Sequence, residues 1–268
     1  MQDNIRNQDK AGEDYWNKTE RNQKIECQPF APIGGIRGFA RRKWHNAFER
    51  AFETGVGKSR KLLELGCGGS TYLPYFARRF GFEVYGLDYS ERGCELARQM
   101  CEASGVSPQI ICADFFNAPA EWLGSFDVVT SFGVVEHFTD TADTVRMFAR
   151  FLRSGGTLLT IVPNLEGMTG WGQKMFSREV FDKHEVITRE RLQKAHQDAG
   201  LSVIENDYFL FTNFGAINPG RNLSLLKKVA FEMLRATTGS IWMLESFLGS
   251  MPSNRYTSPY ILCVARLR

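Results

Sequence analysis

The stretch KLLELGCGGSTYLPYF, from Lys61 to Phe76, carries three local signals that together decide the fold class. Its apolar start predicts a buried strand, and the closely spaced glycines that follow predict a tight turn. Ser70 is a suitable cap for a helix whose apolar residues recur at helical spacing up to Phe80. A strand, a glycine turn and a helix in this order predict the first unit of an α/β sheet. They also predict a turn that approaches a small ligand.

The same alternation of apolar runs and helical patterns continues along the chain. Strands are expected at 61–66, 83–88, 109–114, 126–132, 157–163, 201–211 and 258–267. Capping residues and terminal glycines predict helices between most of these runs, and a turn at 154–156 should precede the fifth strand. Strands that are apolar almost throughout and alternate with helices predict a mostly parallel sheet with helices on both faces.

Three regions lie outside this alternation and are interpreted as a cap. Residues 1–60 form an N-terminal helical lid segment, with helical spacing at 37–52, and residues 61–268 form the main domain. Insertions at 164–187 and 212–257 are long for plain loops, which is typical of lids and binding elements. The second insertion contains an amphipathic helix. Packing of that helix on the domain is preferred, and attachment to a membrane surface is the alternative.

Composition and charge narrow the class of protein. The 268 residues carry a net charge of +3, so no general attraction to nucleic acid is expected. The six cysteines form no C-x-x-C pair and stand near no histidine cluster, so no metal site is predicted. The N-terminus is polar and no run of 18 apolar residues occurs, which predicts a cytoplasmic protein without a transmembrane segment. The 21 phenylalanines fit a Phe-rich core or an aromatic pocket.

Carboxylates stand near the ends of the first three predicted strands. Counting from Gly66, the turn reads G-C-G-G-S-T, so the sixth position is not the glycine of a dinucleotide site. Glu64 suits a cationic amine or sulfonium better than an anion. Asp88 suits ribose hydroxyls, and Asp114 an adenine amino group, with Phe115 beside the ring. Together these residues indicate a ligand with a ribose, an adenine and a positively charged tail.

At this point the chain resembles the class I S-adenosylmethionine-dependent methyltransferases, in the branch with quinone-biosynthesis and natural-product methyltransferases. The matching pieces are LLELGCGGS, VYGLDYS, ICADFF, FDVVTSFGVVEHF and LRSGGTLLTIVPN, in order over about 61–164. Ser70 stands where this family most often has a third glycine. The resemblance implies a Rossmann-like, seven-stranded sheet whose last strand is antiparallel, and S-adenosylmethionine as the cofactor.

The resemblance also implies roles for individual residues. The cofactor-binding set is Tyr15 and Trp16 in a closing N-terminal segment, Glu64, Gly66, Cys67 and Gly68 at the methionine end, Asp88 at the ribose, Tyr89, Asp114 and Phe115 at the adenine, and Ser131, Phe132 and Gly133 facing the reacting centre.

Two further predictions concern the acceptor side. His137 could deprotonate an acceptor or be structural, and the sulfonium itself needs little acid–base help. His184 is a second candidate, placed in the substrate pocket. Tyr208, Phe211 and Phe214 could form an apolar wall of that pocket. This wall favours an aromatic or lipophilic acceptor.

The sequence therefore predicts an enzyme that transfers a methyl group from S-adenosylmethionine to a small molecule. An enzyme that uses the same cofactor for other chemistry is one alternative. An NAD-dependent Rossmann oxidoreductase is another, although the turn pattern disfavours it. A nucleic-acid methyltransferase would carry Asn/Asp-Pro-Pro-Tyr where this chain has SFGV. A non-enzymatic binding protein would not need the complete set of cofactor residues.

Overall fold

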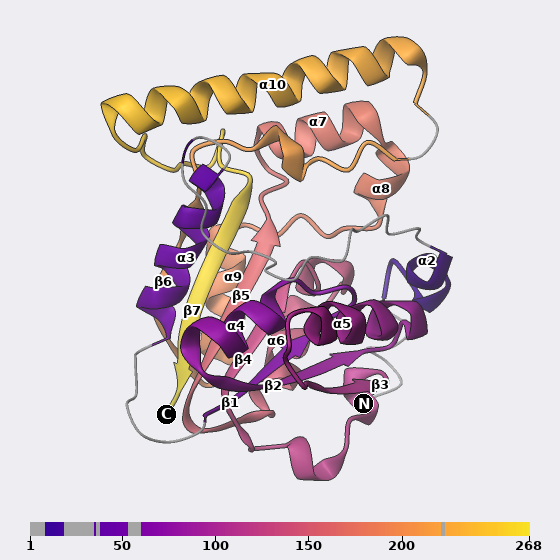
Figure 1. Ribbon diagram of the computed structural model, residues 1–268, viewed down its shortest axis with the longest axis vertical. Coiled ribbons are helices and arrows are strands. Elements are labelled where there is room, and N and C mark those ends of the chain that lie inside the picture. The colour runs from indigo at the N-terminus through magenta and orange to yellow at the C-terminus, as the bar shows by residue number, and fades with distance from the viewer. Residues whose placement is uncertain (1–8, 19–34, 36–37, 53–59, 221–222) are drawn as a thin grey trace.

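One mixed sheet organises the computed structural model, which describes residues 9–18, 35, 38–52, 60–220 and 223–268 (Figure 1). Within these residues the seven strands lie in the order β3-β2-β1-β4-β5-β7-β6. The strands are β1 (Arg60–Leu65), β2 (Phe82–Asp88), β3 (Gln109–Cys112), β4 (Phe126–Phe132), β5 (Leu152–Pro163), β6 (Leu201–Phe209) and β7 (Tyr260–Leu267). The first five run parallel, and β7 is antiparallel to both β5 and β6, between which it lies. The predicted Rossmann-like sheet with an antiparallel last strand is confirmed.

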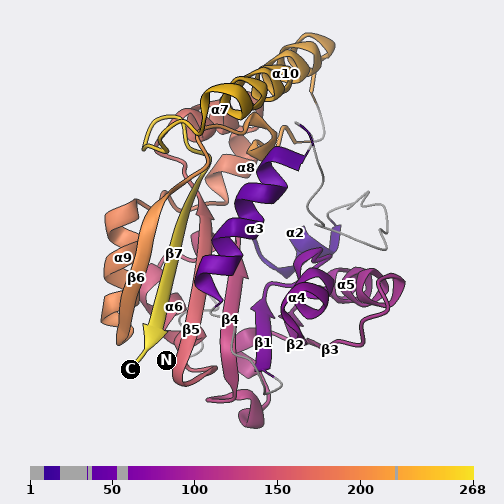
Figure 2. The same cartoon turned by 60° about the vertical axis from the view of Figure 1, so that its left-hand side comes forward.

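Both faces of the sheet are buried, which explains the continuous apolar strands. Neighbouring residues of β1 point to opposite sides, with Leu62 in one core cluster and Leu63 in the other. Helices α3, α4 and α5 cover the Leu62 face, and α6 and α9 cover the other (Figure 2). Their bounds are α3 (Phe39–Ala51), α4 (Tyr72–Phe80), α5 (Glu91–Ala103), α6 (Thr141–Ala149) and α9 (Arg189–Asp198).

The helix boundaries follow local capping chemistry. The side chain of Ser90 accepts a hydrogen bond from the N–H of Gly93 at the start of α5, and Thr188 caps α9 in the same way. Ser70 Oγ accepts from the N–H groups of Tyr72 and Leu73, at 3.0 and 3.3 Å, so it serves the first turn of α4 as expected.

Several strand ends differ from the sequence prediction. Strand β3 ends at Cys112 instead of 114, β7 begins at Tyr260 instead of 258, and β1 is shifted by one residue. The turn expected at 154–156 lies within β5, which begins at Leu152. Phe126 pairs with Leu152 and Val128 pairs with Thr157, so β5 takes up three extra residues as an irregularity in the ladder. Gly155, with a φ of 75°, allows this. Strand β6 ends at Phe209 instead of 211, because Leu210 adopts a positive φ of 64° and leaves the ladder.

The two insertions supply further helices beyond the carboxyl ends of the strands (Figure 1). These are α7 (Met168–Phe176) and α8 (Arg178–Asp182) in the first insertion, and η5 (Phe214–Ala216) and α10 (Leu225–Leu248) in the second. Helices α7, η5 and α10 share a small core of Phe176, Phe214, Ile217 and Phe231. The opposite side of α10 is apolar yet exposed, with Leu226 at 80% and Phe247 at 82%. No helix among the described residues is long and apolar enough to cross a membrane.

Much of the predicted N-terminal lid, 1–60, lies outside the described residues. The described parts include α2 (Glu13–Lys18) and α3, which matches the helix expected at 37–52. Segment 9–18 reaches the main domain through an isolated bridge between Asp9 and Phe138. The five described cysteines are free thiols, and Cys27 lies outside the described residues.

Candidate functional site

The turn between β1 and α4 has a shape that requires glycine at its first position. Gly66 has a φ of 73°, and a Cβ atom there would lie 2.3 Å from Cγ2 of Val134. Its N–H donates to the carbonyl oxygen of Leu87 in β2 at 2.8 Å. A side chain at position 66 would therefore be both strained and obstructed. The turn lies at the carboxyl edge of the sheet, where open α/β sheets bind their ligands.

Asp88, the last residue of β2, holds this turn in place. Its Oδ2 accepts a hydrogen bond from the N–H of Gly68 at 2.7 Å, and its Oδ1 accepts from the N–H of Ser90 at 2.8 Å. Each carboxylate oxygen has two lone pairs, so the group can accept further bonds. Asp88 is thus a fixed acceptor at the sheet edge that can still bind ligand hydroxyls.

Glu64 is a buried carboxyl group at the same edge, only 3% exposed. Its Oε2 accepts a hydrogen bond from Ser70 Oγ at 2.6 Å. Burial raises the pKa of Glu64 to about 8, with the Ser70 bond acting in the opposite direction and Asp88 adding to the rise. A cation placed beside Glu64 would restore its charge, because an opposite charge favours the ionised form.

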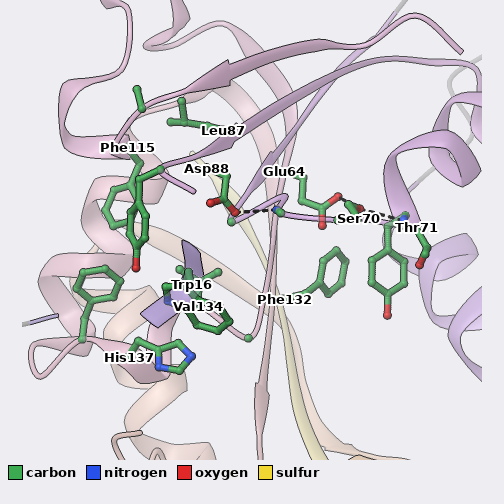
Figure 3. A pocket seen from close by; sticks show the side chains of 18 residues that line it. Trp16, Glu64, Ser70, Thr71, Leu87, Asp88, Phe115, Phe132, Val134 and His137 are labelled. Atoms are coloured by element: carbon green, nitrogen blue, oxygen red, sulfur yellow. Dashed lines mark hydrogen bonds between the residues drawn. The ribbon is translucent and has the colours of Figure 1, made fainter. Parts of the chain in front are cut away.

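These groups line one cavity of about 360 Å³ (Figure 3). Its lining residues are Trp16, Glu64, Gly66, Gly68, Gly69, Ser70, Thr71, Tyr72, Leu87, Asp88, Tyr89, Ala113, Phe115, Phe132, Gly133, Val134, His137 and Phe138. The two carboxyl groups and the glycine turn are polar, whereas much of the remaining wall is aromatic. Phe132 stacks on Tyr72 with ring centroids 4.4 Å apart. The cavity thus combines a few fixed polar groups with apolar surface, which is typical of small-molecule sites.

The N-terminal segment closes one side of the cavity. The ring of Trp16 lies edge-on to that of His137, with centroids 5.2 Å apart, and Tyr15 packs against Trp16 at 5.1 Å. Lys10 N–H donates to the carbonyl oxygen of His137 at 2.9 Å. Asp9 accepts a hydrogen bond from the hydroxyl of Tyr89 at 2.9 Å. Contacts with residues that are distant in the sequence therefore hold residues 9–16 beside the site.

His137 is a buried, neutral imidazole. It ends the short helix η4 (Val135–His137) and is 5% exposed. Its Nδ1 lies 2.9 Å from the carbonyl oxygen of Lys183, to which it donates. Burial, with His184 nearby, lowers the pKa of His137 to about 3. Such a group is a weak base at neutral pH. Its Nε2 atom is therefore better suited to accept a hydrogen bond from a ligand than to take up a proton.

The structure brings most of the predicted cofactor residues to this cavity. Those that line it are Trp16, Glu64, Gly66, Gly68, Asp88, Tyr89, Phe115, Phe132, Gly133 and the catalytic candidate His137. Tyr15 lies behind Trp16. The side chain of Cys67 is fully buried under the turn, where a Cβ on Gly86 would lie 2.6 Å from its sulfur.

Two polar candidates lie near the cavity without lining it. Asp114 caps the short helix η2 (Phe115–Asn117) by accepting from the N–H of Phe116 at 3.0 Å. It lines a neighbouring cavity that also includes Tyr89. Ser131 is fully buried in β4, and its Oγ has no hydrogen-bond partner among the described residues.

The predicted substrate-pocket residues are dispersed. Phe214 packs in the cap core, where Phe176 and Phe231 are also buried. Tyr208 on β6 packs against the main core, with Arg189 over its ring. Phe211 is partly buried after β6. Only the ring of His184 approaches the site, 4.6 Å from that of His137.

Gly69, a further glycine of the turn, also lines the cavity. Several other lining residues were not anticipated from the sequence: Ser70, Thr71, Tyr72, Leu87, Ala113, Val134 and Phe138. The position of Ser70, Thr71 and Tyr72 at the start of α4 was a usable signal, because a helix that follows a glycine turn directs its first residues at the ligand. Val134 and Phe138 flank η4 and carried no such signal.

Comparisons with known proteins agree with this site. A family model described as a methyltransferase domain matches residues 63–160. The ubiquinone biosynthesis O-methyltransferase of Saccharophagus degradans is 30% identical over 154 residues, which cover 54% of this chain and 65% of that protein. The chain thus spans less than two thirds of this relative.

Two solved structures share the fold. The geranyl diphosphate C-methyltransferase of Streptomyces coelicolor has a TM-score of 0.55 at 14% identity, covering 100% of this chain and 98% of that one. The [4+2]-cyclase SpnF has a TM-score of 0.57 at 15% identity, covering 85% of this chain and 81% of that one. At these identities the likeness concerns the fold alone.

The fold and the cavity at its carboxyl edge define a Rossmann-like protein with a cavity of a size suited to a small molecule. Residues 63–160 match a methyltransferase domain, and this part of the chain resembles the class I S-adenosylmethionine-dependent methyltransferases.

Proposed function

We propose that this protein transfers a methyl group from S-adenosylmethionine to a small molecule. The observation that carries the proposal is the cavity in which the buried Glu64, the anchored Asp88 and the ring of Phe115 meet. A buried carboxyl group with no cationic partner among the described residues, a carboxylate acceptor at the end of β2 and an aromatic wall match the amine, the ribose and the adenine of this cofactor. S-adenosylmethionine supplies the electrophilic methyl group when it is bound.

The residues that line the cavity would each bind a different part of the cofactor. Glu64 pairs with the amino group of the cofactor. The backbone at Gly66 and Gly68 lets the methionine end of the cofactor approach the turn closely. Asp88 accepts from the ribose hydroxyls. The further proposed cofactor contacts are Tyr15, Trp16, Cys67, Tyr89, Asp114, Phe115, Ser131, Phe132 and Gly133. These groups bind and orient the donor and exclude water, and such positioning supplies much of the rate of methyl transfer.

An aromatic or lipophilic acceptor is the substrate class that the cavity favours. Phe132, Tyr72 and Val134 form an apolar wall near the glycine turn. The name of the relative, a ubiquinone biosynthesis O-methyltransferase, supports an oxygen atom as the acceptor. His137 and His184 are the polar groups proposed for this side.

The division into a domain at 61–268 with a cap also belongs to this proposal. The cap comprises residues 1–60 and the insertions 164–187 and 212–257. The shared core of α7, η5 and α10, together with the contacts of residues 9–16, supports it. The free thiols of the described cysteines support a reducing, cytoplasmic location.

Titration calorimetry of S-adenosylmethionine and S-adenosylhomocysteine tests the cofactor site. Wild type should bind both in the micromolar range, and Asp88→Ala should weaken binding at least about tenfold, because a hydrogen bond to a charged group is lost. Asp198→Ala removes a carboxylate on α9 whose side chain is 41% exposed, and should bind like wild type. Absence of binding by a folded wild type would refute the proposal. Methyl transfer to phenolic acceptors is then measured by release of S-adenosylhomocysteine.

A further inference from the structure

Three metal-ligating side chains meet beside the cavity, although the sequence predicted no metal site. Glu136 and His137 come from η4, and His184 follows α8. One potential ligand atom from each lies within 4.8 Å of the other two. The sequence did not indicate that these residues form one group, because His184 stands 47 positions after His137 and belongs to an insertion.

The two histidines are held in the orientation that metal ligands need. His137 Nδ1 lies 2.9 Å from the carbonyl oxygen of Lys183, and His184 Nδ1 lies 2.6 Å from that of Val180. A carbonyl oxygen only accepts, so each Nδ1 carries the proton and each Nε2 keeps its lone pair. Neither Nε2 has a hydrogen-bond partner among the described residues. A backbone carbonyl on the other ring nitrogen is the usual support of a metal-binding histidine.

Glu136 provides a second, independent sign of a missing cation. Its side chain is 2% exposed, and Oε2 has no hydrogen-bond partner within the described part of the chain. Buried carboxylates normally pair with a cation or coordinate a metal ion. Lys10 is close, but its ammonium group is bound to Glu185 at 3.0 Å and to the carbonyl oxygen of His184 at 2.9 Å.

We propose that Glu136, His137 and His184 bind one divalent transition-metal ion. Two imidazoles and one carboxylate favour Zn²⁺, Fe²⁺ or Mn²⁺ over Mg²⁺ and Ca²⁺, which prefer all-oxygen sites. Ligands at about 2.1 Å from one ion lie roughly 3–3.5 Å apart in a tetrahedral site, so binding draws the three groups slightly together. His184 lies in the loop after α8, where such an adjustment is easiest.

The position of the ion suggests a role, and this role rests on the proposed methyl transfer. His137 lines the cavity, so three protein ligands leave coordination positions open toward an acceptor. A hydroxyl group of the acceptor bound there would lose its proton to water more easily. Its oxygen then forms the bond to the methyl carbon, the carbon–sulfur bond of the donor breaks, and S-adenosylhomocysteine leaves.

Metal binding is tested on the full chain without reference to activity. Protein treated with a chelator is titrated with Zn²⁺, Mn²⁺ and Mg²⁺ in turn. We expect one Zn²⁺ per chain, weaker Mn²⁺, and little Mg²⁺. Glu136→Gln and His184→Ala should each reduce Zn²⁺ affinity at least about a hundredfold, and Zn²⁺ should raise the melting temperature of wild type but of neither variant. His45→Gln, at a histidine on α3 outside the group, is the matched control.

Two results would overturn the metal site. One is wild type that binds none of the three ions at micromolar concentration, and the other is equal Zn²⁺ affinity in wild type and in both variants. Binding of S-adenosylhomocysteine, measured with the metal-free proteins, shows that each variant is folded. It also separates the two proposals, since the cofactor can bind where the metal does not, and the metal can bind where the cofactor does not.

Discussion

The close approach of Val134 to Gly66 allows the geometry of the turn to be tested quantitatively. Gly66→Ala adds one Cβ atom that would lie 2.3 Å from Val134 Cγ2, at a backbone φ of 73°. The left-handed backbone costs an L-residue about 1–2 kcal/mol, and overpacking typically adds about 1–3 kcal/mol. The expected loss in the free energy of unfolding is therefore about 2–5 kcal/mol.

Gly81→Ala is the matched control for this variant. Gly81 ends α4 with a φ of 71°, and a Cβ there would meet nothing within 4 Å. It carries the backbone strain without the clash. Alanine also restricts the unfolded chain equally in both variants, so this effect cancels in the comparison. The difference between Gly66→Ala and Gly81→Ala should thus be the clash alone, about 1–3 kcal/mol.

Urea denaturation of both variants, with equal slopes, measures this difference. In a chain of this size it corresponds to roughly 2–12 °C in melting temperature. Val134→Ala removes the obstructing methyl group, so its addition to Gly66→Ala should recover most of the difference. Equal destabilisation by Gly66→Ala and Gly81→Ala would refute the close contact between the turn and Val134.

Three other predictions follow from the same site. Burial gives Glu64 a pKa of about 8, so pairing with the cofactor amine at pH 7 should release a proton from its carboxyl group. Calorimetry of cofactor binding in two different buffers measures this proton release for wild type. A release that persists in Glu64→Gln would contradict the prediction. The pKa of Glu136 is likewise raised from 4.5 to about 8. Between these values the unfolded chain has lost protons that the folded chain keeps on Glu64 and Glu136. The free energy of unfolding should therefore fall as pH rises from about 6.5 to 8, by up to about 1.4 kcal/mol per pH unit for each of the two glutamates. Denaturation across this range checks the slope, which Glu136→Gln should reduce. Trp16→Ala should weaken binding of S-adenosylhomocysteine about tenfold in calorimetry, about 1.4 kcal/mol, and unchanged binding would remove Trp16 from the site.

Below pH 6.5 the buried histidines change the free energy of unfolding with pH in the direction opposite to that of the two glutamates. The pKa of His137 is lowered from 6.5 to about 3 and that of His196 to about 4, so unfolded chains bind more protons there. Their stabilising effect grows as pH rises toward 6.5 and offsets the effect of the two glutamates. The pH window above 6.5 is therefore the one in which the buried carboxyl groups can be observed separately.

The sheet and the polar half of the site were predictable because their signals are local. The end of β2 lies two residues before Ser90, the cap of α5, and β1, its turn and the start of α4 form one continuous stretch. Asp88 was found because a strand end fixes where its side chain lies once the sheet is parallel. The irregularity in β5 was not visible, because a turn and a bulge with the same glycines look alike until the partner strand is known.

The acceptor half depended on contacts between distant segments. The pattern around Phe214 predicted an apolar wall of the substrate pocket, but it could not tell a ring facing the cavity from one facing α10. The structure places Phe214 in the cap core instead. In the same way, His184 looks like an isolated histidine until the fold brings α8 beside η4. Residues in insertions are therefore the ones whose roles the sequence predicts least.

The two buried glutamates suggest how one cavity could serve two different partners. Glu64 lies beside the glycine turn, where it can be satisfied by the cationic tail of the donor. Glu136 lies with His137 and His184, where it can be satisfied by a metal ion that holds the acceptor. Each carboxyl group is protonated or unpaired without its partner, and each partner restores a charge that burial opposes. The methyl group would then pass between two sites whose charges are balanced only when donor and metal are both bound.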